Sequence, residues 1–219
     1  MIHLYFFLVG AIFASFLGLV IDRFPERSIV FTASHCDSCQ TRLRPLDLIP
    51  IISQVVYRFR CRYCNSSYPF WYAFFEFGLG LLFLAFSWEF LTFSQIILVT
   101  AGLTLGIYDL RHQEYPLLVW LIFHLILMVC SSWNLVMIFF LILGILAHFI
   151  DIRIGAGDFL FLVSCALVFS LTETLILIQF ASTTGILAFL LLKKKERLPF
   201  VPFLLLAACM IIFGKLLLV

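Results

Sequence analysis

The chain has 219 residues, of which 64% are hydrophobic and 12% are charged, and its formal net charge is +2. Soluble domains are about 45–50% apolar, so this composition excludes a soluble enzyme of ordinary make-up. A membrane-spanning helix needs roughly 20 mostly apolar residues, and the chain offers several such runs. We therefore predict an all-α, polytopic membrane protein that contacts the lipid bilayer and has no nucleic-acid partner.

The apolar runs predict about eight transmembrane helices, the first of them a retained span rather than a secretory signal. They cover residues 3–21, 71–90, 93–108, 116–131, 134–150, 159–172, 174–192 and 201–219. The long run 159–192 is divided at Thr172-Glu173-Thr174, because a glutamate is costly in the middle of a bilayer. The sequence thus predicts three parts: a first span (1–21), a polar loop (22–70) and a membrane core (71–219).

The Lys and Arg residues predict the orientation, since cytoplasmic loops carry an excess of both. All of them except Lys215 fall in the loops 22–70, 109–115, 151–158 and 193–200. With eight spans these loops lie on one side. We therefore expect a cytoplasmic polar loop and both termini outside.

Four of the seven cysteines lie in the polar loop as two Cys-x-x-Cys pairs, namely Cys36 with Cys39 and Cys61 with Cys64. Two such pairs, separated by a short loop, are typical of a closed tetrahedral zinc site. Disulfides are disfavoured in a reducing cytoplasm. The sequence thus predicts a structural Zn²⁺ site that clips the loop together.

Two aspartates lie at the ends of apolar runs, Asp109 after one run and Asp158 before another. Two predicted spans separate them, so both carboxyls are expected at the cytoplasmic face. Gly155 and Gly157 precede Asp158 and predict a non-helical turn that another segment can approach closely. Paired carboxyls that share a proton can activate water and polarise a carbonyl, which is aspartyl protease chemistry.

These residues resemble the GxGD class of membrane aspartyl proteases, and the loop resembles that of one family within it, the prepilin peptidases (type IV leader peptidases). The resemblance rests on Asp109, on Gly155-Ala156-Gly157-Asp158, on Asp47-Leu48-Ile49-Pro50 between the cysteine pairs, and on Arg60-Cys61-Arg62-Tyr63-Cys64. It extends to Ser15-Phe16-Leu17-Gly18-Leu19, Arg23-Phe24-Pro25, Tyr72-Ala73-Phe74-Phe75-Glu76 and Leu198-Pro199-Phe200-Val201-Pro202-Phe203. Gly18 and Ala73 depart from the usual Asn and Pro of the family.

The resemblance implies an aspartic endopeptidase of the bacterial plasma membrane that cleaves the cytoplasmic leader from prepilins or pseudopilins of pilus, competence or type II secretion systems. Asp109 and Asp158 would be catalytic. His112, three residues after Asp109, and Glu76 are candidate supporting residues; a loop arginine is an equally good partner for Glu76. Many members of the family also N-methylate the new amino terminus with S-adenosylmethionine, which this sequence indicates by resemblance alone.

Two other interpretations stay open on the sequence. One is a different GxGD protease of the presenilin or signal-peptide-peptidase type, although the tetracysteine loop and the absence of a Pro-Ala-Leu triplet argue against it. The other is a non-enzymatic transport or assembly protein with a structural zinc loop, in which both aspartates would be dispensable.

Overall fold

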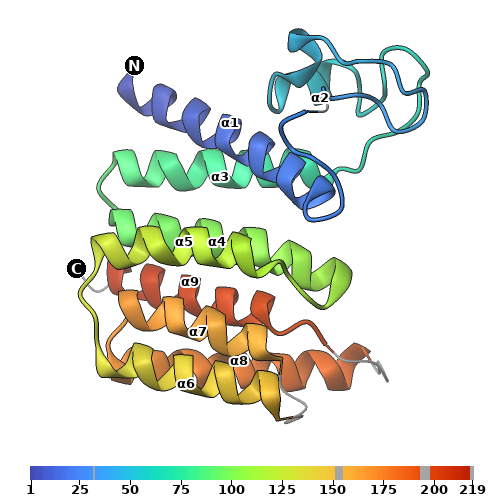
Figure 1. Ribbon diagram of the computed structural model, residues 1–219. Helices are drawn as coiled ribbons and strands as arrows, with labels where there is room; N and C mark the ends of the chain where they lie inside the picture. Colours follow the sequence, from blue (N-terminus) through green and yellow to red (C-terminus); the bar gives the residue numbers. More distant parts are fainter. Residues whose placement is uncertain (32, 151–154, 193–197, 218–219) are drawn as a thin grey trace. The chain divides into compact units, whose positions relative to one another are not determined.

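The computed structural model describes residues 1–31, 33–150, 155–192 and 198–217 (Figure 1). These residues form α-helices and one 3₁₀-helix, and within these ranges the β-structure is limited to two isolated bridges. The helices are α1 (Ile2–Arg23), α2 (Ile52–Val56), α3 (Trp71–Ser87), α4 (Phe93–His112), α5 (Leu117–Cys130), α6 (Leu135–Phe149), α7 (Ala156–Val168), α8 (Leu171–Leu192) and α9 (Val201–Leu217), with the 3₁₀-helix η1 at Pro45–Leu48. The prediction of an all-α protein is confirmed.

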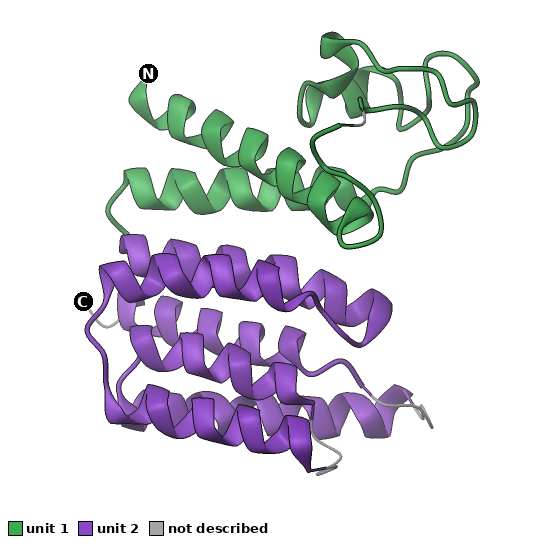
Figure 2. Ribbon diagram, in the orientation of Figure 1, with its two compact units in different colours: residues 1–90 green, residues 91–219 purple. Residues whose placement is uncertain are grey.

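The chain divides into two compact units, residues 1–90 and 91–219 (Figure 2). In the first unit α1 packs along α3, and small residues bring the two helices close together. A Cβ added to Gly10 would lie 2.6 Å from the carbonyl oxygen of Leu79, and one added to Gly80 would lie 2.7 Å from the Phe7 ring. The sequence predicts a membrane core of residues 71–219 that includes α3, and this division stays a prediction; the contacts of α3 join it to α1.

The second unit contains α4 to α9. Helix α4 packs against α5 and α9, α7 packs against α6, and α8 packs against α9. Residues 161–167 of α7 are all buried, as are eleven residues of α4. These two helices therefore form the interior of the unit, and each carries one of the two aspartates.

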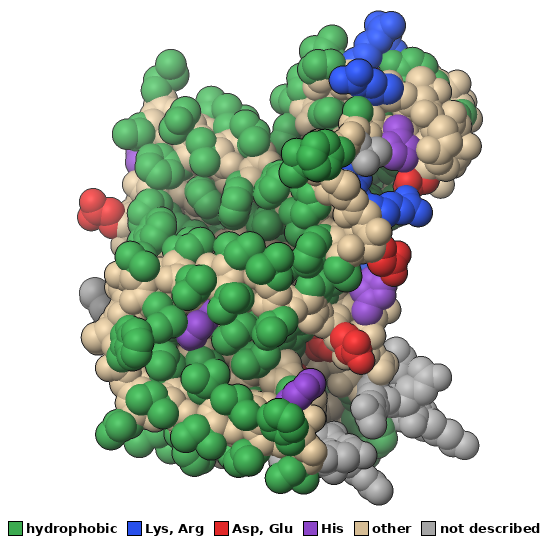
Figure 3. All heavy atoms as spheres, viewed as in Figure 1, with side chains coloured by type: hydrophobic (Ala, Val, Ile, Leu, Met, Phe, Trp, Pro, Cys, Tyr) green, Lys and Arg blue, Asp and Glu red, His purple; other side chains and the backbone are tan. Residues whose placement is uncertain are grey.

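The apolar helices indicate a membrane protein. Among the described residues α1, α4 and α8 are long and apolar enough to cross a membrane, and α3, α5, α6, α7 and α9 are shorter apolar helices. Hydrophobic side chains cover most of the helical surface on the face drawn in Figure 3, with many exposed Leu, Ile and Phe residues. Such a surface suits contact with lipid. The number of spans stays a prediction.

The break between α7 and α8 differs from the predicted one. Helix α7 ends at Val168 and α8 begins at Leu171, so Thr172-Glu173-Thr174 lies in the first turn of α8. The cause is a capping box. The N–H of Ser170 donates to the Glu173 carboxylate at 2.9 Å, and the N–H of Glu173 donates to the Ser170 hydroxyl at 3.4 Å. Glu173 also pairs with Lys215. Glu173 thus begins the helix instead of interrupting it.

Arg153 and the basic cluster 193–197, on which the predicted orientation partly depends, lie outside the described residues. The arginines of the loop 24–70 are described and belong to the first unit.

Candidate metal centre and acidic site

The four loop cysteines come together in the first unit. Their sulfur atoms all lie within 4.8 Å of one another, and the Sγ atoms of Cys36 and Cys64 are 3.8 Å apart. None of the four forms a disulfide. In a tetrahedral site with metal–sulfur bonds of about 2.3 Å, neighbouring sulfurs are ~3.8 Å apart. The cluster therefore has the geometry to hold one metal ion.

The two cysteine pairs lie in loops built in the same way. The N–H of Cys36 donates to the Thr41 carbonyl, and Cys61 does the same to Ser66. The N–H of the fourth residue after each first cysteine, Gln40 or Asn65, returns to that cysteine's carbonyl, and both residues have a left-handed φ (55° and 62°). An isolated bridge closes each loop, His35 with Arg42 and Arg60 with Ser67. Each pair is thus a hydrogen-bonded knuckle that points its sulfurs at the other.

The environment of Cys36 favours its thiolate form. Burial raises the pKa of its thiol, but hydrogen bonds from the N–H groups of Cys39 and Ser38 and from the Ser66 hydroxyl lower it by more. The resulting pKa is about 5. A thiolate is the form that binds metal. Cys36 is therefore the cysteine of the cluster whose surroundings favour the metal-binding form most strongly.

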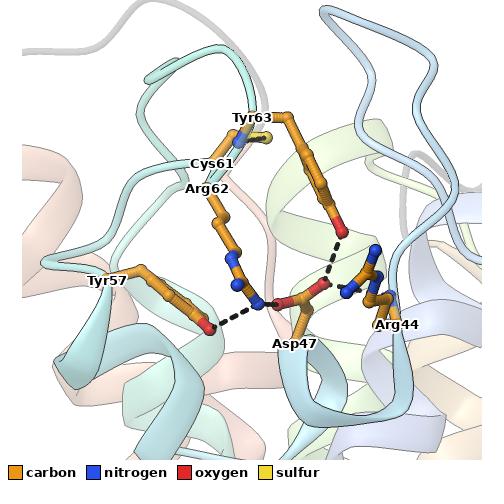
Figure 4. Close-up of polar contacts among 6 residues, drawn as sticks. All are labelled: Arg44, Asp47, Tyr57, Cys61, Arg62 and Tyr63. Carbon is orange, nitrogen blue, oxygen red and sulfur yellow. Dashed lines mark hydrogen bonds and ion pairs between the residues drawn. The ribbon is translucent and has the colours of Figure 1, made fainter.

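The Asp47-Leu48-Ile49-Pro50 segment contacts the second knuckle through Asp47, as Figure 4 shows. Asp47 lies in η1, and its Oδ2 accepts from the N–H of Arg44 at 3.0 Å and from the Tyr63 hydroxyl at 3.4 Å. Its Oδ1 lies 4.0 Å from an Nη1 atom of Arg62, which also donates to the Tyr57 hydroxyl. The side chain of Asp47 is 5% exposed. Asp47 thus fixes the Asp-Leu-Ile-Pro segment on the residues between Cys61 and Cys64.

Glu76, a candidate supporting residue, also belongs to the first unit. It is 4% exposed in α3, and its Oε2 accepts from the N–H of Ile51 at 2.7 Å and from the Gln54 side-chain amide at 2.8 Å. These partners are a backbone N–H and a glutamine amide, and not the loop arginine that the sequence offered. Ile51 has an unusual positive φ of 61°, which is rare for a β-branched residue. Glu76 therefore holds the strained start of α2.

Asp109 lies in the last turn of α4 and is 7% exposed. Its Oδ2 accepts from the N–H of Val201, the first residue of α9, at 3.0 Å. The backbone N–H of Phe200 faces the same carboxylate. His112 lies exposed one turn further along α4, with its ring 6.5 Å from that of Tyr108. Asp109 is thus anchored on a segment that follows it by 92 residues.

Asp158 lies in the first turn of α7, and its carboxyl is close enough to Asp109 for the two groups to interact electrostatically. Tyr115, from the segment between α4 and α5, lies near both aspartates. Its hydroxyl donates to the carbonyl of Gly157. The structure therefore brings the two predicted acids together, with a tyrosine that the sequence analysis did not single out.

The backbone around the two glycines is not the turn expected from the sequence. Gly155 precedes α7 with extended angles (φ −63°, ψ 129°), Gly157 is helical, and no described glycine has a positive φ. The expected close approach does occur. A Cβ on Gly157 would lie 2.9 Å from the Tyr115 ring, and one on Gly155 would lie 3.3 Å from Oδ2 of Asp158. Both positions need glycine for space and not for backbone freedom.

A line of polar contacts fixes the position of α7 beside the preceding helices. The indole N–H of Trp120 donates to the Leu160 carbonyl at 2.7 Å and to the Ser164 hydroxyl at 3.1 Å. His124 lies 3.2 Å from the same hydroxyl, and the Asn134 amide donates to the Ala166 carbonyl. Such bonds between apolar helices resist sliding. They therefore fix the position of α7, and with it that of Asp158, along the direction of the helices.

Comparison with known proteins gives a family match within the first unit. Residues 8–90 match the family described as "Bacterial Peptidase A24 N-terminal domain". The chain is 35% identical over 118 residues to "Prepilin leader peptidase/N-methyltransferase" of Myxococcus xanthus, a match that covers 52% of this chain and 35% of the relative. It is 28% identical over 130 residues to "Type 4 prepilin-like proteins leader peptide-processing enzyme" of Escherichia coli O78:H11, covering 49% of this chain and 48% of the relative. The chain thus spans less than half of either relative. No solved structure matches.

Proposed function

We propose that this chain, which is similar to prepilin peptidases over part of its length, is a membrane aspartic endopeptidase that removes the leader from type IV prepilins or pilin-like precursors. The observation that carries the proposal is the pairing of Asp109 and Asp158. They come from the end of one buried helix and the start of another, and their carboxyls lie within electrostatic range. An acid that only marks the end of a helix at the water interface would be exposed and would need no second carboxyl beside it.

The pair has the chemistry to hydrolyse a peptide without a nucleophilic side chain. Two close carboxyls cannot both ionise easily and so share one proton. The ionised carboxyl takes a proton from water as the water oxygen bonds to the scissile carbonyl carbon. The protonated carboxyl gives its proton to the carbonyl oxygen. The C–N bond then breaks as the amine nitrogen receives a proton from the first carboxyl. At the same time the second carboxylate takes a proton back from a hydroxyl of the tetrahedral intermediate, which leaves a carboxylic acid and restores the shared proton. The apparent pKa values belong to the coupled pair and not to either aspartate, so the role of first base is assigned to the pair.

The substrate proposed is a precursor whose polar leader lies in the cytoplasm and whose next segment is apolar and lies in the membrane. Both named relatives process prepilin or prepilin-like proteins. Competence pilins and type II secretion pseudopilins have the same design. We place the site at the cytoplasmic side of the bacterial plasma membrane, with both termini outside.

The tetracysteine cluster is proposed to hold structural Zn²⁺. Four thiolate ligands at a tetrahedral separation match zinc and leave no open position for a substrate. The ion would clip the two knuckles together and hold Asp47 against the second one. Its role would be in folding of the loop and not in hydrolysis.

A second activity, N-methylation of the new amino terminus, is supported by the name of the Myxococcus xanthus relative. The first unit contains a cavity of about 580 Å³, a volume suited to a small ligand. Its lining includes Glu76, Tyr68 and Gln54, whose Oε1 is buried and has no hydrogen-bond partner among the described residues. These acceptors fit the ammonium end of S-adenosylmethionine, which would supply the methyl group. Gln54 and Glu76 would hold that end.

The test is cleavage of a pilin-like precursor by the purified chain in lipid vesicles, followed by mass spectrometry of both products. We expect one cut after the last leader residue. Addition of S-adenosylmethionine should then raise the mass of the mature product by one methyl group. A precursor left intact contradicts the endopeptidase and favours the non-enzymatic interpretation. Cleavage within the apolar segment instead of at the leader favours another GxGD protease.

A further inference from the structure

The segment Leu198-Pro199-Phe200-Val201-Pro202-Phe203 has no role in the mechanism above, yet it contains the start of α9. A helix begins with N–H groups that have no partner inside the helix. Usually a Ser, Thr, Asp or Asn side chain just before the helix accepts from them. Here Phe200 stands before the helix and has no side-chain acceptor. Helix α9 must therefore take its cap from elsewhere.

The unused donor at this helix start is the N–H of Val201. Phe203 and Leu204 already donate to the Phe200 carbonyl, at 3.0 and 3.2 Å, and Pro202 has no N–H. The Val201 N–H donates to Oδ2 of Asp109 at 3.0 Å, and both residues are buried. Asp109 thus supplies the cap that the sequence next to α9 lacks.

Packing holds this contact in place. Helices α4 and α9 lie against each other, and Gly106, one turn before Asp109, faces Pro202. A Cβ on Gly106 would lie 3.8 Å from Pro202, within ordinary contact distance. Val201 is 1% exposed and Leu204 is 0% exposed. The start of α9 therefore cannot move away from Asp109 without opening the interior of the unit.

The bond distinguishes the two oxygens of Asp109. Oδ2 is committed to a backbone donor whose position is set by two packed helices. A carboxylate held in this way keeps one orientation, and the orientation of a reacting group controls rate strongly. Asp158 is placed differently, by the first turn of its own helix beside Gly155.

We propose that Val201 is a positioning residue for peptide hydrolysis, which acts through its backbone N–H by orienting the Asp109 carboxylate toward Asp158 and the substrate. This inference rests on the proposed function. It assigns the Leu198–Phe203 segment to the peptidase site, although no side chain of that segment takes part in the chemistry.

The test removes one hydrogen-bond donor and keeps the rest of the helix. Val201→Pro eliminates the N–H at the first helical position, where proline is well accepted. Val201→Ala keeps the N–H and is the matched control for the lost side-chain volume. Replacement of Val201 by its α-hydroxy acid analogue makes a backbone ester, which removes the same N–H with no proline ring and no change of side chain.

For cleavage of a prepilin in vesicles, we expect both N–H-deficient proteins to lose kcat by roughly 10- to 100-fold with KM unchanged. Val201→Ala, which keeps the N–H, should lose much less kcat than the ester protein. The inference is overturned if the ester protein has wild-type kcat, or if Val201→Ala loses as much as the ester, since packing would then explain the loss. If the wild type does not cleave, the proposed function itself fails. If the wild type cleaves and Asp109→Asn does not, while the ester protein is normal, this inference alone fails.

Discussion

Replacement of Gly157 by alanine should disturb the acidic site through Tyr115. The new Cβ would lie 2.9, 3.1 and 3.2 Å from Cε1, Cζ and the hydroxyl oxygen of the Tyr115 ring. Ordinary van der Waals contacts of a Cβ begin at 3.4 Å, so the ring or α7 must shift by about half an ångström. The shift would also break the hydrogen bond from the Tyr115 hydroxyl to the Gly157 carbonyl. Because Tyr115 lies beside both aspartates, the pair should lose its alignment.

The size of the effect follows from two opposing terms. Overpacking of a filled interior costs about 1–3 kcal/mol, and alanine in place of a helical glycine gains about 0.5–1 kcal/mol. Gly157→Ala should therefore destabilise the protein by up to about 2.5 kcal/mol. Gly214→Ala in α9, where a Cβ meets nothing within 4 Å, should be neutral or stabilising. The alignment loss should lower kcat by on the order of 10².

The assay combines prepilin cleavage in vesicles with thermal unfolding in detergent for Gly157→Ala, Gly214→Ala, Tyr115→Ala and the double variant Gly157→Ala with Tyr115→Ala. Removal of the ring should make Gly157→Ala much less destabilising than it is beside Tyr115, a coupling that a double-mutant cycle measures. Equal kcat and stability in wild type and Gly157→Ala would refute the reasoning. So would a Gly157→Ala penalty that is unchanged in the absence of the ring.

Two further changes test other parts of the account. Tyr115→Phe keeps the ring and removes the donor to Gly157; we expect about 0.5–1.5 kcal/mol of lost stability and a smaller fall in kcat than for Gly157→Ala, and an unaltered protein would remove Tyr115 from the site. Purified protein should contain about one zinc per chain by elemental analysis, lost in Cys61→Ser and kept in Cys130→Ser, whose cysteine lies exposed on α5. A folded, active protein without metal would contradict the zinc proposal.

Much of the fold follows from the apolar runs. Each of the eight runs contains a helix in the structure, most with bounds within a few residues of those predicted. The family indicated by the motifs is also the one that residues 8–90 match, and the two relatives carry names from the same family. Hydropathy and short motifs are local properties, and they suffice for these two results.

The break after α7 was misplaced although its signal is local. Glu173 was treated as a charge inside an apolar run, whereas Ser170 three residues earlier makes it part of a capping box. The spacing Ser-x-x-Glu before an apolar run is readable in a sequence. Ser170 therefore marks the start of α8 in the sequence itself.

The surroundings of the aspartates could not be read in this way. Tyr115 reaches Gly157 across 42 residues, and Val201 reaches Asp109 across 92. The second contact uses a backbone N–H, which every residue except proline has, so residue type gives no signal. The grouping of α3 with α1 likewise depends on helix packing around Gly10 and Gly80.

The most direct test of the two-aspartate proposal is the cleavage rate of a prepilin by Asp109→Asn and by Asp158→Asn, with Glu114→Gln as the control at an exposed acid close to Asp109. Asparagine keeps the size and polarity of each side chain but cannot take or give the proton. We predict that each Asn variant inserts and folds but loses cleavage by at least about 10³-fold, as expected for a general acid–base pair acting as a unit, while Glu114→Gln cleaves normally. Normal cleavage by either Asn variant would contradict the account.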